Sequence, residues 1–250
     1  MGAMSGLDDE VKRGDPDRWL ASRFVADPAR RAELVALYAL NLELARVAGS
    51  VRTPIMGEIR FAWWREGIEE LGRAAPRNPA LAGLVAAAGE HRLDVGALEA
   101  LIEARHAELD AAPFAGEPAL VGYIDATAGG VMRAAARLLN PAAPPEAVAA
   151  AGRAWGWASL LRAGPALAAA GRRWTPASWG EPTDEEIARH VAYRIADALV
   201  QAREQVRHLP VAAFPAVAYA ALARDTARGR APGELGGRVR LAAAVLRGRV

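Results

Sequence analysis

Apolar residues recur along this chain every three to four positions, which is the spacing of the buried face of an α-helix. No stretch alternates apolar and polar residues for long enough to indicate a β-strand, and no repeat of fixed period is present. Proline and glycine separate the periodic segments. The pattern predicts helices near residues 16–25, 29–49, 54–73, 79–90, 94–111, 117–139, 144–171, 183–208, 211–228 and 235–248.

Several of these segments are apolar on more than one face, and 144–171 is the clearest example. Such two-sided segments are typical of central helices in a large bundle, although close alanine packing without a cavity would give the same pattern. No long linker divides the chain. The sequence therefore predicts an all-α, single-domain helical bundle over residues 15–250. Residues 1–14 open with "MGAMSG", which looks like a vector-derived leader, and we expect them to be flexible.

Composition narrows the class of protein. The hydrophobic content of 52% is dominated by alanine, which favours helix, and 250 residues are enough for a sizeable core. The net charge is only +2, and Lys12 is the one lysine. The absence of cysteine excludes disulfides and thiolate metal sites. No apolar run reaches the roughly 20 residues that cross a bilayer. We therefore expect a soluble, cytoplasmic protein.

The basic stretch between Arg224 and Arg240 is interleaved with small residues and lacks aromatic ones. Base stacking on aromatic side chains is the usual way of holding single-stranded nucleic acid, so no nucleic-acid partner is expected. A solvated face, or a weak contact with anionic lipid at the membrane periphery, is the better interpretation.

Common catalytic motifs are absent: there is no P-loop, no G-x-G-x-x-G after a strand, no H-E-x-x-H and no G-x-S-x-G. The histidines are scattered on polar stretches, which favours surface positions for all of them: His91, His106, His190 and His208. Glu108 and Asp110 follow in "RHAELDAA", but residues two apart do not share a helix face. We interpret this stretch as a solvated face.

Four segments nevertheless form an ordered set between Trp19 and Pro176: "RRAELVALYALNLELARV", "PIMGEIRFAWWREGIEEL", "YIDATAGGVM" and "GRAWGWASLLRAGPALAAAGRRWTP". Together they resemble the squalene/phytoene synthase family. The resemblance implies an isoprenoid synthase fold, an all-α bundle around a central cavity. In working members of that family, two prenyl diphosphates couple head to head, with Mg²⁺ bound by two Asp-rich motifs.

The first of these motifs resembles "CRxxDDxxD". Laid without gaps after "YA", it places its arginine at Leu42 and its aspartates at Ala45, Arg46 and Gly49. Mg²⁺ takes oxygen ligands, and carboxylates four residues apart share one helix face. None of those carboxylates is present in this chain, and Glu43, the nearest acid, points about a third of a turn away.

The second motif resembles "NILRDVxED…GRxYLP". Its asparagine falls on Ser159, and its aspartates fall on Ala163, Leu167 and either Pro165 or Ala166. Its basic and structural positions are kept at Arg162, Gly171, Arg172, Trp174 and Pro176. Both Asp-rich motifs have therefore lost their acids, and we expect neither a metal site nor a cofactor.

The stretch "LARVAGSVRTPIMGEIRFAWWREGI" is most similar to the subgroup of the family that includes the mitochondrial complex I assembly factor. That similarity implies a non-catalytic role in binding, lipid handling or assembly of a membrane complex, with a prenyl lipid, a prenyl diphosphate or a membrane-complex protein as partner. The alternative is an isoprenoid diphosphate transferase with an atypical, metal-poor site, which would need Mg²⁺. A third hypothesis is a lipid carrier that keeps the cavity without the reaction.

Eight residues are candidates for the cavity wall or for binding an anion: Tyr38, Glu43, Arg46, Tyr123, Asp125, Ser159, Arg162 and Arg172. Arg162 is the strongest of them, because an arginine on an apolar helix is costly unless it is paired. A buried salt bridge to Glu43 or Asp125 is the competing interpretation. Tyr38 either lines the cavity or packs in the core.

Two small groups of residues beside these motifs carry structural predictions. Trp155 and Trp157 flank the second motif, and we expect them to fill the space that substrates occupy in synthases. Gly129 and Gly130 in "TAGG" are expected to allow close helix packing.

Overall fold

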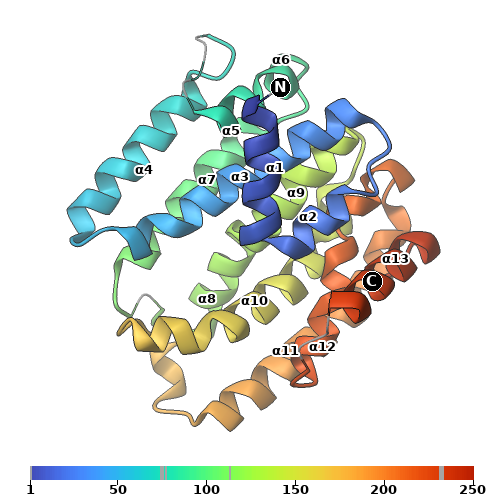
Figure 1. The fold of residues 1–250 in the computed structure, drawn as a ribbon. Helices are drawn as coiled ribbons and strands as arrows, with labels where there is room; N and C mark the ends of the chain where they lie inside the picture. Colours follow the sequence, from blue (N-terminus) through green and yellow to red (C-terminus); the bar gives the residue numbers. More distant parts are fainter. Residues whose placement is uncertain (1, 74–75, 77, 113, 231–233) are drawn as a thin grey trace.

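The structure is a computed structural model that describes residues 2–73, 76, 78–112, 114–230 and 234–250. Its described residues form α-helices and short 3₁₀ helices and no β-strand, which confirms the all-α prediction (Figure 1). The α-helices are α1 (Gly2–Gly14), α2 (Pro16–Ser22), α3 (Pro28–Ser50), α4 (Pro54–Glu69), α5 (Pro79–Ala82), α6 (Val85–Gly89), α7 (Val95–His106), α8 (Glu117–Ala126), α9 (Ala128–Leu139), α10 (Ala149–Ala169), α11 (Asp184–Gln205), α12 (Ala223–Ala227) and α13 (Glu234–Arg247). The 3₁₀ helices are η1 (Ala107–Leu109), η2 (Pro145–Val148), η3 (Ala177–Trp179), η4 (Val206–His208), η5 (Val211–Ala216) and η6 (Ala218–Leu222).

Helix starts follow the capping residues in the sequence. The Asp27 carboxylate accepts a hydrogen bond of 2.8 Å from the Ala29 amide, and Pro28 occupies the first turn of α3. The Thr183 hydroxyl accepts from the Glu186 amide at 3.3 Å, while the Glu186 carboxylate accepts from the Thr183 amide at 2.8 Å. This reciprocal capping box fixes the start of α11.

The core is divided into two buried clusters. The larger one joins α3, α9 and the 3₁₀ segments η5 and η6, and the smaller one joins α8, α10 and α11. Helix α10 packs on α9 and α11, and α3 packs on α1 and α9, so α3 and α10 are central helices (Figure 1). This arrangement places the sides of α3 and α10 that carry the two motif regions around one space.

Helices α9 and α10 approach each other through glycine. A Cβ atom built on Gly152 would lie 2.7 Å from the Cα atom of Gly129, so any side chain there would meet backbone. One turn further along, a Cβ on Gly156 would lie 2.4 Å from a methyl carbon of Ile124. The prediction of close packing is thus confirmed for Gly129, and the contact brings α10 close enough to close one side of the cavity.

The prediction that residues 1–14 are flexible is wrong for residues 2–14, which form α1. Leu7 is 6% exposed and Val11 is fully buried, and α1 packs on α3. Burial of these two apolar side chains stabilises the helix on the domain. The Lys12 ammonium lies 5.0 Å from the centre of the Trp19 ring. The N-terminal segment is therefore part of the folded unit.

Three predicted helices are divided. The segment 117–139 breaks at Thr127, where the backbone leaves helical geometry and the hydroxyl bonds back to the Tyr123 carbonyl at 2.7 Å. The segment 79–90 forms two short helices, and 211–228 is mostly 3₁₀ with Pro215 inside it. Proline lacks the amide proton that a continuous α-helix would need there. Among the helices of the described residues, none is long and apolar enough to cross a membrane.

Candidate functional site

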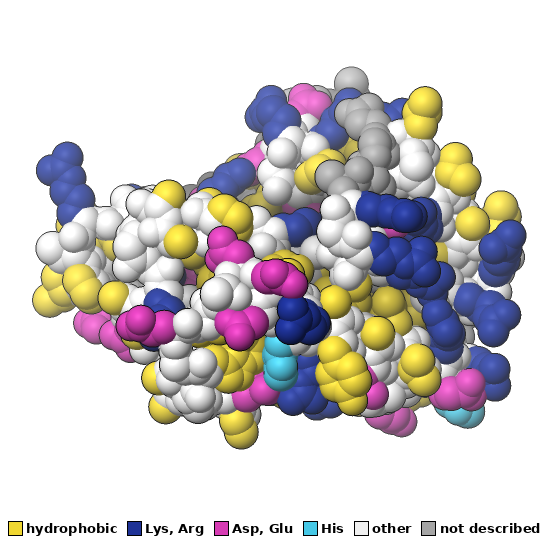
Figure 2. Space-filling model, turned by 90° about the horizontal axis from the view of Figure 1, so that it is seen from below, with side chains coloured by type: hydrophobic (Ala, Val, Ile, Leu, Met, Phe, Trp, Pro, Cys, Tyr) yellow, Lys and Arg dark blue, Asp and Glu magenta, His cyan; other side chains and the backbone are white. Residues whose placement is uncertain are grey.

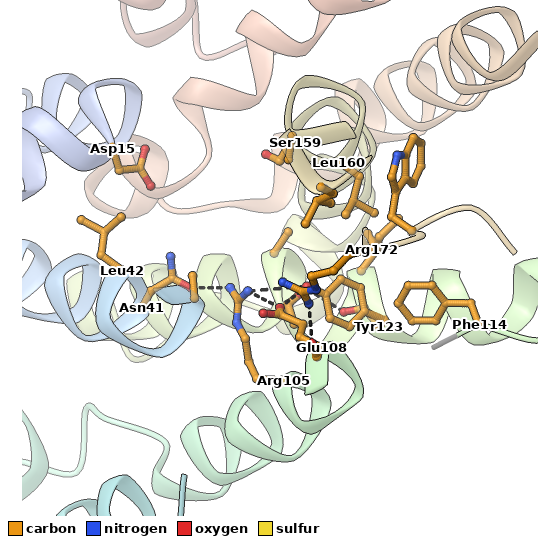
Figure 3. Close-up of a pocket in the computed structure, with 18 of the residues that line it drawn as sticks. Asp15, Asn41, Leu42, Arg105, Glu108, Phe114, Tyr123, Ser159, Leu160 and Arg172 are labelled. Carbon is orange, nitrogen blue, oxygen red and sulfur yellow. Dashed lines mark hydrogen bonds and ion pairs between the residues drawn. The ribbon is translucent and has the colours of Figure 1, made fainter. Parts of the chain in front are cut away.

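A cavity of about 430 Å³ lies between α3, α8 and α10 and is closed by the turn before α2, the end of α7 and the segment after α10 (Figure 3). This confirms the predicted central cavity. Its lining residues are Gly14, Asp15, Arg18, Asn41, Leu42, Ala45, Arg105, Glu108, Phe114, Tyr123, Ile124, Thr127, Ala128, Gly156, Ser159, Leu160, Ala163, Leu167, Arg172, Arg173 and Trp174.

The two motif regions meet in this cavity. Leu42 and Ala45 line it from α3, and Ala163 and Leu167 line it from α10. These are four of the positions at which the family resemblance places functional residues, and each of them is apolar here. The two facing walls therefore present apolar side chains at Ala45, Ala163 and Leu167, where the resemblance places carboxylates, and at Leu42, where it places an arginine.

The other two positions of the first motif lie outside the cavity. Gly49 is exposed, and a Cβ built on it would meet no atom within 4 Å. The Arg46 guanidinium pairs with Glu10 of α1 at 2.5 Å and with Glu43 at 3.1 Å. Glu43 and Arg46, predicted as cavity or anion-binding residues, thus face α1 on the outer side of α3. Arginine therefore stands at position 46, where the motif has an aspartate, and its ion pair with Glu10 joins α3 to α1.

A polar network crosses the floor of the cavity. The Arg105 guanidinium pairs with the Glu108 carboxylate at 2.5 Å and donates to the Asn41 side-chain oxygen at 3.1 Å. The Tyr123 hydroxyl donates to the same Glu108 carboxylate, and Arg172 donates to the Glu108 backbone carbonyl (Figure 3). The network ties together α3, α7, α8 and the segment after α10.

Burial and neighbouring charges shift the pKa values of two members of this network, Arg105 and Tyr123. Burial alone would lower the pKa of Arg105, but the adjacent Glu108 carboxylate and Tyr123 raise it above its ordinary value. Burial raises the pKa of the Tyr123 hydroxyl, and the Arg105 cation only partly opposes this. The tyrosine is therefore a neutral donor to a carboxylate that is already held by arginine.

A second ion pair lies at the other end of the cavity, where Asp15 bonds Arg18 at 2.6 Å. The Arg18 guanidinium carbon lies 5.0 Å from the Tyr219 ring centre, 5.7 Å from that of Trp155 and 5.8 Å from that of Tyr38. Burial would lower the pKa of Arg18, but Tyr219 and Asp15 raise it. Arg18 is thus a permanent buried cation surrounded by aromatic rings.

The segment after α10 brings further cations to the cavity. Gly171 has a φ of +68°, a conformation that favours glycine, and it turns the chain so that Arg172 and Arg173 line the wall. The Arg173 guanidinium donates to the Thr175 hydroxyl at 3.1 Å and to nearby carbonyls. Ser159 supplies a hydroxyl from α10. Four arginines and two carboxylates therefore line the cavity, which carries a net positive charge.

The remaining predicted residues lie elsewhere. Tyr38 is fully buried against Tyr219 and does not line the cavity. Asp125 forms a two-pronged ion pair with Arg153, with both contacts at 2.7 Å. Tyr38 and Asp125 thus have structural roles. Of the eight candidates, only Tyr123, Ser159 and Arg172 line the cavity.

Arg162 points away from the cavity as well. Its guanidinium lies 3.5 Å from the Asp17 carboxylate and 4.4 Å from the Trp155 ring centre. Burial lowers its pKa, and Asp17 partly offsets that shift. The predicted pairing of Arg162 with Glu43 or Asp125 is wrong, because α2 supplies its acid.

The two tryptophans of α10 do not fill the cavity. Trp155 packs on Tyr219 with ring centres 4.9 Å apart, and Trp157 stacks with Trp179 at 6.4 Å. Neither lines the cavity, so the prediction that they occupy substrate space is wrong. Both turn toward the two core clusters, where their large apolar surface is buried.

The donor set does not fit Mg²⁺. Asp15 and Glu108 are the carboxylates that line the cavity, and each is bound by an arginine. The described residues contain no group of three or more His, Cys, Asp or Glu side chains placed to hold a metal ion. Mg²⁺ requires oxygen ligands in near-octahedral geometry, which apolar walls and paired carboxylates do not offer.

Sequence reasoning missed the centre of the site. Glu108 was predicted on a solvated face, but its side chain is only 12% exposed, and Arg105 beside it was not singled out. A signal existed, because Arg105 and Glu108 are three residues apart and can pair at a helix end. Asp15 and Arg18 pair with each other three residues apart, but their place at the cavity was missed because the rings around Arg18 come from distant parts of the chain.

An all-α bundle around a central, two-walled cavity is the architecture of isoprenoid synthases, and solved structures agree. A dehydrosqualene synthase in complex with ligand superimposes with a TM-score of 0.79 at 12% identity, covering 98% of this chain and 96% of that one. A squalene synthase from Alicyclobacillus acidocaldarius gives a TM-score of 0.72 at 17% identity, covering 99% and 94%. These likenesses show the fold.

The chain belongs to the squalene/phytoene synthase family, which matches residues 11–240. A curated relative from Mus musculus, NADH dehydrogenase (ubiquinone) complex I, assembly factor 6, is 27% identical over an alignment of 225 positions that covers 82% of this chain and 67% of the relative. Both the family and the subgroup expected from the sequence are thereby confirmed.

Proposed function

We propose that this protein is a non-catalytic member of its family that binds an isoprenoid with an anionic head group and acts in the assembly of a membrane complex. One observation carries the proposal: Ala45, Ala163 and Leu167 line the cavity at positions where carboxylates would be needed to hold metal ions. Departure of a diphosphate requires neutralisation of its charge, which bound metal ions normally supply.

The cavity retains what binding needs. Its volume of about 430 Å³ is within the range of small-molecule sites, and its walls combine apolar residues with a few convergent polar groups. Arg172 and Arg18 offer planar guanidinium groups that recognise phosphate or carboxylate without a metal. An isoprenoid chain that lies along Leu42 and Leu167 would contact the apolar residues of the cavity. Its anionic end would lie toward Arg172, one of the polar groups.

The open cavity favours lipid handling over a filled, purely structural pseudo-site. The side chains of Trp155 and Trp157 lie in the core clusters and leave the space free. An unfilled apolar cavity loses packing contacts, so a chain that had only a structural role would gain stability by closing it.

The assembly role rests on the mouse relative, which is named as an assembly factor of a respiratory complex. We propose a membrane-complex protein as partner and a location at the periphery of a membrane. A pull-down from the native cell with mass spectrometry would identify the partner, and recovery of this chain without any membrane-complex subunit would contradict that part of the proposal.

The test of the cavity uses farnesyl or geranylgeranyl diphosphate with Mg²⁺. We expect no pyrophosphate release, together with an increase in Tm when the lipid is added. Ala163→Trp should abolish the increase by filling the cavity, whereas Ala166→Trp, on the exposed side of α10, should retain it.

Release of pyrophosphate by the wild type, lost in Ala163→Trp and kept in Ala166→Trp, would overturn the non-catalytic assignment and favour the metal-poor transferase. An equal Tm response from both variants would contradict lipid binding in the cavity.

A further inference from the structure

A second hollow lies far from the cavity, between the end of α11, the start of α12 and α13. This groove has a volume of about 840 Å³, and five arginines line it: Arg203, Arg224, Arg240, Arg247 and Arg249. Arg203 comes from α11, Arg224 from α12, and the rest from α13 and the residues after it. Three separate segments therefore converge to present guanidinium groups in one place.

Acidic partners are scarce in the groove. Among the described residues, the one side-chain carboxylate that pairs with any of the five is Asp225, which is buried and bonds Arg240. Arg203 donates at 3.4 Å to the terminal main-chain oxygen of Val250, the last residue of the structure. Arg224, Arg247 and Arg249 have no ion pair or side-chain hydrogen bond within the described part of the chain. Five arginines against Asp225 and the Val250 terminus leave the groove with an excess of positive charge.

The crowding of these charges is visible in Arg224. Its pKa is lowered by partial burial, and further by the nearby Arg203, Arg228 and Arg240 cations. Like charges held within one groove repel each other, and an anion that binds among them relieves the repulsion. The groove is therefore complementary to a phosphate-bearing ligand.

Aliphatic side chains accompany the arginines on α13. Leu235, Val239 and Leu246 are 76%, 69% and 86% exposed, and their spacing puts them on one face of the helix. Arg240 and Arg247 are seven residues, or about two turns, apart and lie on one side of the helix beside that face. Figure 2 shows basic side chains gathered on the side where α12 and α13 lie in Figure 1, with apolar ones between them.

We infer that this groove and the exposed face of α13 form a docking surface for a membrane that contains anionic phospholipid, with arginines on the phosphates and Leu235, Val239 and Leu246 between the acyl chains. Charge complementarity selects an anionic partner. Exposed aliphatic residues without aromatic ones select lipid over nucleic acid, because bases are held by stacking. The inference is independent of what the cavity binds.

Co-sedimentation of the full chain with vesicles tests the inference. We expect binding to vesicles of phosphatidylcholine mixed with phosphatidylglycerol, and little binding to phosphatidylcholine alone. Binding should fall when salt reaches about 1 M, where the Debye length is about 3 Å. Arg224→Gln/Arg247→Gln should reduce partitioning about 10- to 30-fold, because each arginine near an anionic surface contributes about 1 kcal/mol.

Matched variants separate this surface from general charge. Arg137→Gln/Arg189→Gln removes the same charge from exposed positions on α9 and α11 and should bind as the wild type does. Leu246→Ser should weaken binding without changing its dependence on anionic lipid. Circular dichroism and Tm establish that each variant is folded. If the double variant does not fold, Arg247→Glu at an exposed position replaces it.

Several outcomes would overturn the inference. These are equal binding to both vesicle types, equal losses in the groove and control variants, or stronger binding to a single-stranded oligonucleotide than to the anionic vesicles. A Tm increase with inorganic phosphate that disappears in Arg224→Gln/Arg247→Gln, without any vesicle binding, would assign the groove to a soluble phosphate instead.

Discussion

The Arg105 guanidinium and the Glu108 carboxylate are 2.5 Å apart inside the cavity, and each side chain is only 12% exposed. The pair spans the point where α7 passes into η1. Glu108 is one of the two carboxylates on the cavity lining, and this contact neutralises it. Arg105 and Arg18 are thus each paired with a cavity carboxylate, whereas Arg172 donates to a backbone carbonyl, that of Glu108.

Removal of one partner of this pair should be strongly destabilising. Glu108→Ala leaves Arg105 buried without its counter-ion, and we expect a loss of about 3–5 kcal/mol in the free energy of unfolding. Arg105→Met/Glu108→Leu replaces the pair by apolar side chains and should cost much less than the two single changes together. Urea unfolding measures all three variants. Additive losses would show that the two side chains are not coupled.

The glycine contact between α9 and α10 should resist even a methyl group. In Gly152→Ala the new Cβ would meet the Gly129 backbone at 2.7 Å, which no side-chain movement relieves. Overpacking of this kind costs about 1–3 kcal/mol.

Gly122→Ala is the matched control on α8, because a Cβ there meets nothing within 4 Å. Alanine is preferred over glycine in a helix by about 0.8–1 kcal/mol, so this variant should be more stable than the wild type. Thermal unfolding that ranks Gly152→Ala at or above Gly122→Ala would refute the close contact.

Carboxylates restored to the cavity should create a metal response. Ala163 and Leu167 are four residues apart and both line the cavity, so Ala163→Asp/Leu167→Asp places two acids on one face toward it. We expect Mg²⁺ or Mn²⁺ to raise the Tm of this variant, because ligands that bind only the folded state stabilise it. Ala166→Asp/Ala170→Asp, on exposed positions, should show no response. Equal shifts in both variants would indicate non-specific ion binding.

The capping box of α11 gives a pH dependence of known sign. Hydrogen bonds from the Thr183 backbone and side chain lower the pKa of Glu186 below its ordinary value of 4.5. A carboxylate with a lowered folded-state pKa stabilises the fold above the unfolded-state pKa, and this stabilisation is lost as pH falls through the folded-state value. Glu186→Ala should therefore lower Tm at pH 7, and the difference from the wild type should shrink as pH falls below the ordinary value of 4.5 and disappear once pH is below the lowered folded-state pKa. A difference that is constant with pH would rule out this linkage.

Helix positions were predictable because they depend on neighbouring residues, and the family was predictable because its motifs follow one another in order along the sequence. Asp27 and Thr183 mark helix starts through capping, and the two motif regions follow one another in readable order. The break at Thr127 was not predictable, because the apolar period continues across it and only the hydrogen bond to Tyr123 reveals it. Helix propensity alone likewise did not predict α1, because the stability of this helix comes from burying Val11 against α3.

The apolar residues of α3 and α10 at the cavity were predictable from the sequence, but the polar network around Arg105 and Glu108 was not. Leu42, Ala45, Ala163 and Leu167 all line the cavity, because motif spacing on a regular helix determines which face they occupy. Arg162 was misassigned because its partner, Asp17, is 145 residues away, and no local pattern reports such a contact. Side-chain direction at a helix end, as at Glu108, depends on the neighbours that packing brings.

The apolar cavity walls also change the thermodynamics of the empty protein. Carboxylates that face each other across a cavity repel until cations arrive, so folding and metal loading become linked. Alanine and leucine at 45, 163 and 167 carry no charge, so these positions contribute no such repulsion to the empty protein. At these three positions, folding requires no counter-ion to be in place first.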